Sequence, residues 1–124
     1  MPGGVYVHQF PDRFVATWYR VPHYYYGGSN TIQAVLFRDG RIQVGYNGIS
    51  STQSGTLVGI APGNGAAGRQ VNFNVDSPLT ISGTQGVYEW FGTFDLDVQF
   101  LIFSPTGPGG YNVSVKPLQG AAAN

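Results

Sequence analysis

The amino-acid sequence predicts an all-β fold: two antiparallel sheets of about eight to ten short strands, packed as a β-sandwich with a jelly-roll-like arrangement. Three observations lead to this prediction. The 19 glycines and 8 prolines suit closely spaced turns and disfavour helices. Charged residues make up only 10% of the chain, which leaves few for exposed helix faces. Apolar and polar residues alternate over short runs, as in strands that are buried on one face.

Turn signals divide the chain into ten segments that are rich in β-branched and aromatic residues. Segment 13–21 is apolar on both faces, which predicts a central strand. Asp39-Gly40 predicts a type I′ hairpin between two of the segments, because that turn needs positive φ angles. Segment 70–75 alternates as a half-exposed strand does, and segment 87–91 fits either a strand or a helical turn. The expected segments are 5–9, 13–21, 31–38, 41–46, 56–61, 70–75, 79–82, 87–91, 97–103 and 111–116.

Length and charge limit the domain organisation and the classes of partner. The 124 residues suffice for one domain, expected over 1–118, followed by a tail of small residues over 119–124. Six Lys and Arg balance six Asp and Glu, so the chain lacks the basic field of a nucleic-acid binder. No apolar run is long enough to span a membrane, so we expect no membrane insertion. The first residues do not have the pattern of a signal peptide.

Four aromatic residues and a histidine are the candidate binding residues. Tyr24, Tyr25 and Tyr26 follow His23 directly, and three consecutive tyrosines cannot all face inward. Exposed rings with polar tips suit stacking on sugars or anchoring a protein interface. The alternative is that they cap the open end of the sandwich. Trp90 is the fourth aromatic candidate; the alternative places it in the core, where Trp18 is also expected.

Metal-binding and catalytic patterns are weak. Asp95 and Asp97 are two residues apart and, with Asp76 and Glu89, are calcium candidates, although Ca²⁺ needs six to eight oxygen ligands. The alternative places Asp95 in a turn and Asp97 on an exposed strand face. No cofactor is expected, since cysteine is absent and neither His8 nor His23 has metal-ligand spacing. No Gly-x-Ser-x-Gly elbow is present, and we expect no enzyme activity.

Five sequence elements in order resemble a known family. They are Arg13-Phe14-Val15-Ala16-Thr17-Trp18, Val21-Pro22-His23-Tyr24, Asn30-Thr31-Ile32-Gln33-Ala34-Val35-Leu36, Asp39-Gly40-Arg41-Ile42 with Tyr46, and Val58-Gly59-Ile60. Over residues 13–60 they are similar to the nidogen-like extracellular β-domain of bacterial secreted and surface proteins. The resemblance implies an extracellular, non-catalytic module for adhesion or matrix contacts. The family has several strands before the tryptophan strand, whereas only residues 1–12 precede it here. Three alternatives follow: the fold is trimmed, later strands fill the gap, or another chain supplies the missing strands.

The sequence therefore predicts a non-catalytic module for protein contact, adhesion or structural spacing on a bacterial surface or secreted protein. One alternative is a subunit that assembles with itself through sheet edges into a filament, shell or oligomer. A second alternative is a carbohydrate-binding module that uses the exposed tyrosines.

Overall fold

The computed structural model is mostly β, with 61% of residues in strands and 5% in helix. It describes residues 2–23, 27–50, 55–63, 65, 67–83, 85–107 and 109–118. Within these residues lie ten strands and one short helix, and no helix among them is long and apolar enough to cross a membrane. The expected tail, 119–124, and three of the candidate binding residues, Tyr24, Tyr25 and Tyr26, lie outside the described residues.

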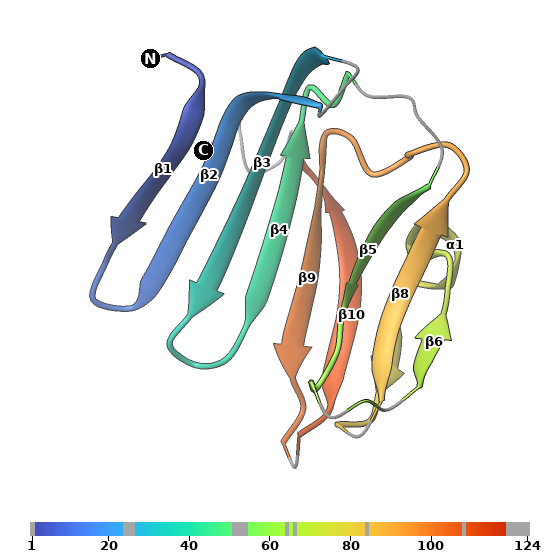
Figure 1. Ribbon diagram of the computed structural model, residues 1–124. Helices are drawn as coiled ribbons and strands as arrows, with labels where there is room; N and C mark the ends of the chain where they lie inside the picture. Colours follow the sequence, from blue (N-terminus) through green and yellow to red (C-terminus); the bar gives the residue numbers. More distant parts are fainter. Residues whose placement is uncertain are drawn as a thin grey trace.

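Seven strands form the large sheet, in the order β1-β2-β3-β4-β9-β10-β7, and every neighbouring pair is antiparallel (Figure 1). The first four are consecutive in the chain, so this part of the sheet is a meander. The strands are β1 (Gly4–Gln9), β2 (Arg13–His23), β3 (Gly27–Phe37), β4 (Ile42–Asn47), β7 (Leu79–Ile81), β9 (Gln99–Pro105) and β10 (Tyr111–Pro117).

Three strands form the small sheet, in the order β5-β8-β6. They are β5 (Thr56–Ile60), β6 (Gly68–Gln70) and β8 (Gly86–Phe91), so the segment that fitted a strand or a helical turn is a strand. The expectation of antiparallel pairing throughout is wrong for one pair, because β6 runs parallel to β8. A parallel partner needs a crossover connection, and β7 and its flanking loops lie between these two strands in the chain.

The hydrophobic core is shared by the two sheets. Phe73, Val87 and Phe91 come from the small sheet or the segment beside it, and they form one cluster with Leu101, Phe103 and Val113 of the large sheet. Figure 1 shows that the small sheet lies over the β9 and β10 side of the large sheet, with β1, β2 and β3 extending beyond it. The core therefore occupies one half of the large sheet's inner face.

The expected strand over 70–75 is wrong. The chain leaves β6 at Gln70 and forms a single helical turn, α1 (Phe73–Asp76). The Asn72 side chain accepts a hydrogen bond from the Val75 N–H (3.1 Å), and Asp76 accepts one from the Asn72 N–H (2.8 Å). These reciprocal caps satisfy the backbone groups that a strand would have paired with a neighbour. Alternation of apolar residues alone could not reveal them.

The Asp39-Gly40 hairpin is confirmed, but its turn type is not I′. Among the described non-glycine residues, positive φ angles occur at Arg20 and Val98, so Asp39 does not have one, whereas Gly40 has φ 97°. The Gly40 N–H bonds the Phe37 carbonyl (3.0 Å), and the Phe37 N–H bonds the Arg41 carbonyl (2.9 Å). This pattern is typical of a longer hairpin loop that ends in a left-handed glycine.

Gly59 allows the small sheet to pair closely. A Cβ at this position would lie 2.3 Å from the Val87 carbonyl oxygen and 2.9 Å from the Tyr88 Cα, both backbone atoms of β8. We expect Gly59→Ala to lower the free energy of unfolding by about 1–3 kcal/mol, because β5 must move away from β8. Gly92→Ala is the matched control, since nothing lies within 4 Å of its Cβ. Equal denaturant midpoints for the two variants would contradict this prediction.

Candidate functional site

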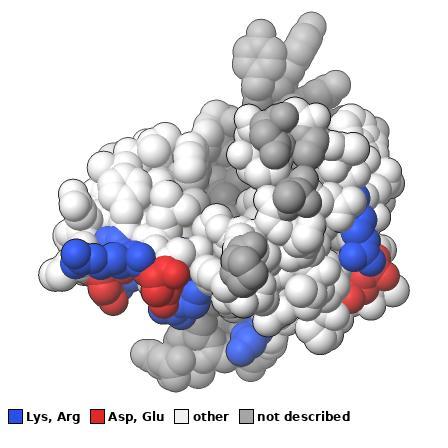
Figure 2. Space-filling view, turned by 90° about the horizontal axis from the view of Figure 1, so that it is seen from below, with Lys and Arg blue, Asp and Glu red and all other residues white. Residues whose placement is uncertain are grey.

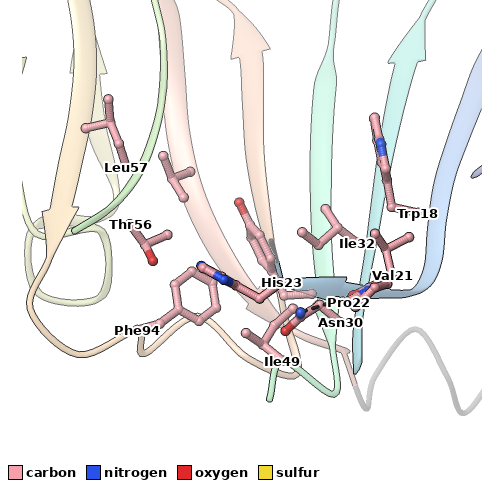
Figure 3. A pocket seen from close by; sticks show the side chains of 12 residues that line it. Trp18, Val21, Pro22, His23, Asn30, Ile32, Ile49, Thr56, Leu57 and Phe94 are labelled. Atoms are coloured by element: carbon pink, nitrogen blue, oxygen red, sulfur yellow. Dashed lines mark hydrogen bonds between the residues drawn. The ribbon is translucent and has the colours of Figure 1, made fainter. Parts of the chain in front are cut away.

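A groove of about 350 Å³ lies where the edge of the small sheet meets the inner face of the large sheet (Figure 3). Strand β5 forms one wall, and the ends of β2 and β3 form the other. Its described lining is largely apolar and contains no carboxylate side chain. Such a concave apolar surface with a few polar groups is typical of a binding site. The polar side chains of the groove are His23, Asn30, Tyr46 and Thr56.

The floor of the groove is a stack of aromatic rings. Phe94, in the loop after β8, meets the buried Tyr46 edge-on with ring centroids 5.0 Å apart, and lies 5.0 Å from Phe91 of the core. Burial raises the pKa of the Tyr46 hydroxyl far above its usual range. Because Tyr46 stays neutral, the floor adds no charge to the groove.

A bulge in β2 directs the end of this strand into the groove. The β2–β3 register shifts after Trp18, where Arg20 has φ 51° and its N–H bonds the Thr31 hydroxyl (3.1 Å). A bulge re-aims the residues that follow it. Beyond it, the Asn30 side-chain amide donates to the Val21 carbonyl (3.1 Å), and His23 points across the groove toward Phe94 in Figure 3. His23 is the one described member of the predicted His23–Tyr26 group.

The two tryptophans lie elsewhere than the sequence suggested. Trp18, expected in the core, is 38% exposed and lines the groove. Trp90 is 56% exposed on the outer face of the small sheet, opposite Leu57 on β5. It therefore lies one strand away from the groove, and the structure does not bring it together with His23. The binding roles of His23, Trp90 and the three tyrosines stay predictions.

Beyond the groove, no described strand or helix lies over the inner face of the large sheet. The strand registers align side chains of β1, β2 and β3 into rows such as Val5–Trp18–Ile32 and Val7–Ala16–Ala34. The same rows continue into Tyr46 and Val44 of β4, beside the core. We call the apolar residues of these three strands the open face: Val5, Val7, Phe14, Ala16, Trp18, Ile32, Ala34 and Leu36. Sequence reasoning missed it because alternation shows which side chains share a face, but not whether a layer covers that face.

Charged side chains are absent from the open face, and one group of them lies at an end of the large sheet. Figure 2 shows basic and acidic side chains interleaved along one side of this end. They belong to the β1–β2 and β3–β4 turns, where Arg13 pairs with Asp12 and Arg41 pairs with Asp39. The Arg41 backbone N–H holds the pKa of Asp39 below its ordinary value. Arg13 and Arg41 also lie over the rings of Phe10 and Phe37, each 4.0 Å from the centroid.

The calcium candidates Asp95 and Asp97 make hydrogen bonds within and between loops. Asp97 lies in a turn before β9, which begins at Gln99, so its expected place on a strand is wrong. Its Oδ1 accepts hydrogen bonds from the backbone N–H groups of Gly48 (2.9 Å), Ile49 (3.2 Å) and Val98 (3.0 Å). The Asp95 carbonyl accepts one from the Asn74 side chain (2.8 Å). In the described part of the chain, no three His, Cys, Asp or Glu side chains form a group that could hold a metal ion.

Asp97 holds the loop that carries Ile49 into the groove. We expect Asp97→Ala to lower the free energy of unfolding by about 1–3 kcal/mol, because three backbone N–H groups lose a charged acceptor. Asp95→Ala is the matched control: within the described ranges its carboxylate makes no hydrogen bond, and we expect a change within about 0.5 kcal/mol. Urea denaturation measures both. A larger loss for Asp95→Ala than for Asp97→Ala would contradict this assignment.

Glu89 is a buried carboxylate on the inner face of the small sheet, 7% exposed, and it accepts a hydrogen bond from the Phe73 N–H (2.8 Å). Burial raises its pKa above the ordinary value of 4.5, and the negative charges of Asp95 and Asp76 add to this, against the opposing effect of the Phe73 bond. The folded protein therefore holds the Glu89 proton more tightly than the unfolded chain does. Its contribution to stability is greatest below pH 4.5 and declines as the pH rises through the folded pKa.

We expect Glu89→Gln to flatten this dependence, because the neutral amide can accept the same hydrogen bond without titrating. The free energy of unfolding of the variant minus that of the wild type should increase as the pH is raised from 4.5 toward 8. Denaturant melts of both proteins at each pH measure the difference. A difference that stays constant with pH would refute the assignment.

Comparison with known proteins identifies no relative: no family model, curated protein or solved structure matches this chain.

Proposed function

We propose that this chain is a non-catalytic β-sandwich module of a secreted or cell-surface protein, and that it acts by protein contact through the open face. In this proposal the two sheets form the two layers of the sandwich, which is supported by the core that they share. The single observation that carries the proposal is the open face, a core-like surface of eight apolar residues over which no described strand or helix packs. Apolar patches of this kind are typical of protein interaction sites.

The size and composition of the groove support a binding role. Its described lining is concave and largely apolar, with a few polar side chains, as is typical of binding sites. The groove extends the open face, since Trp18 and Ile32 belong to both.

The experiment measures binding of the immobilised chain to three probes: fibrillar collagen, laminin and a set of cell-surface polysaccharides. We expect at least one of the two proteins to bind and Leu36→Glu to weaken that binding by about tenfold or more, because Leu36 lies half exposed on the open face and a charge there must be desolvated. Val75→Glu, also at an exposed apolar site but on α1, is the matched control and should bind as the wild type does.

Two outcomes would contradict the proposal. The first is binding to polysaccharide alone that is lost in Trp90→Ala, which would favour the carbohydrate-binding alternative. The second is protein binding that Leu36→Glu and Val75→Glu reduce equally, which would place the contact elsewhere on the surface.

A further inference from the structure

We propose that Asn47 is a site of spontaneous covalent modification, at which water converts the side-chain amide to a carboxylate, and that the Asp97 carboxylate restrains this reaction. The reaction reroutes part of the backbone through the side chain of residue 47. It thereby loosens the loop that carries Ile49 into the groove. This inference goes beyond the proposed function and does not depend on it.

The chain places a glycine after an asparagine at the end of β4. Asn47 is the last residue of this strand and is exposed, and Gly48 follows it with φ 79°. Glycine has no side chain to shield its own backbone nitrogen. Apart from the chain neighbours, nothing lies within 4 Å of the place that a Gly48 Cβ would occupy. The Gly48 nitrogen can therefore approach the amide carbon of Asn47 without steric hindrance.

The other asparagines that the structure describes lack this combination. Each is followed by a residue with a side chain, and each makes a hydrogen bond through its amide group; they are Asn30, Asn72, Asn74 and Asn112. Among the described residues, the Asn47 amide has no such bond. The second Asn-Gly pair of the sequence, at positions 64 and 65, has its asparagine outside the described residues. Asn47 is thus the described asparagine whose surroundings favour the reaction.

The reaction needs only hydroxide and water. Hydroxide removes the proton of the Gly48 N–H, and the nitrogen attacks the side-chain amide carbon of Asn47. A carbon–nitrogen bond forms and the bond to the amide nitrogen breaks; this nitrogen takes a proton from water and leaves as ammonia. Water then opens the resulting cyclic imide. Opening at the side-chain carbonyl leaves aspartate, whereas opening at the main-chain carbonyl leaves isoaspartate, whose backbone passes through the side-chain carbon.

Asp97 opposes the first step of this reaction. Its Oδ1 accepts the hydrogen bond from the Gly48 N–H (2.9 Å), and the same oxygen accepts those of Ile49 (3.2 Å) and Val98 (3.0 Å). Removing the Gly48 proton breaks this bond and places a negative nitrogen against a carboxylate, and like charges disfavour each other. A hydrogen bond to a carboxylate is among the stronger ones in proteins, so its loss corresponds to a change of about tenfold or more in rate.

Isoaspartate at position 47 lengthens the backbone where β4 enters the loop. Bonds at both ends hold this loop: Asp97 accepts from its first two N–H groups, and the Asn30 side chain accepts from the Ser50 N–H (3.0 Å). A longer backbone shifts the loop against these anchors, and the new carboxylate adds a negative charge next to the residue that Asp97 binds. Ile49 lies between the anchors and lines the groove (Figure 3). The modification therefore changes the shape of the groove.

Peptide mapping by mass spectrometry, after incubation at mildly alkaline pH, measures the modified fraction at each asparagine. We expect Asp97→Ala to raise the rate at Asn47 about tenfold or more, because proton loss from Gly48 is no longer opposed. Asp95→Ala should react at the wild-type rate, since its carboxylate makes no bond to this loop. Gly59→Ala is the control for lost stability, because it weakens the small sheet and leaves the Asp97 bonds intact, and it should also react at the wild-type rate.

Three outcomes would overturn the role of Asp97. Equal rates at Asn47 in Asp97→Ala and in the wild type would show that the carboxylate does not restrain the reaction. A slower rate in Asp97→Ala would make the carboxylate a base that promotes it. Equal acceleration in Asp97→Ala and Gly59→Ala would assign the rate to the stability of the whole fold.

Tryptophan fluorescence tests the effect on the groove. Trp18 lines the groove with Ile49, and Trp90→Phe removes the other of the two tryptophans. In this background we expect the Trp18 emission to change in proportion to the isoaspartate formed at position 47. It should stay constant in Asn47→Gln, because the longer side chain needs a larger ring that closes more slowly. Isoaspartate formation with unchanged emission would overturn the loosening of the loop.

Discussion

The structure depends on the difference in size between its two sheets. A sheet of three strands cannot cover the inner face of a sheet of seven, yet an apolar row on the larger sheet runs across five of its strands without a break. This row is Val7–Ala16–Ala34–Val44–Leu101. Where the small sheet lies above a row, as at Leu101 and Phe103, the side chains are buried core. Where it does not, as at Val7 and Leu36, chemically similar side chains are exposed. Core and open face are thus one continuous surface, divided by the reach of the small sheet.

The contacts that fix the loops lie at the border between the core and the open face of the large sheet. Asp97 fixes the loop after β4, and Asn30 joins the end of β2 to that loop by donating to the Val21 carbonyl and accepting from the Ser50 N–H (3.0 Å). Phe94 links the floor of the groove to the core. The Asp97 bond to Gly48 and the Asn30 bond to Ser50 join segments that are 49 and 20 residues apart in the sequence. The shape of the groove therefore depends on tertiary structure, whereas the alignment of side chains on the open face depends on strand register.

This difference explains which features the sequence could predict. The alternation in β4 and the Asp39-Gly40 turn are local signals, and both led to correct elements. The error at 70–75 arose because Val71, Phe73 and Val75 alternate as in a strand, while the Asn72 and Asp76 caps that form α1 leave only a weak trace in the sequence. The exposure of Trp18 shows a second limit of prediction from the sequence. Its strand was predicted correctly, but whether its face is covered depends on how many strands form the other sheet, and no local pattern contains that number.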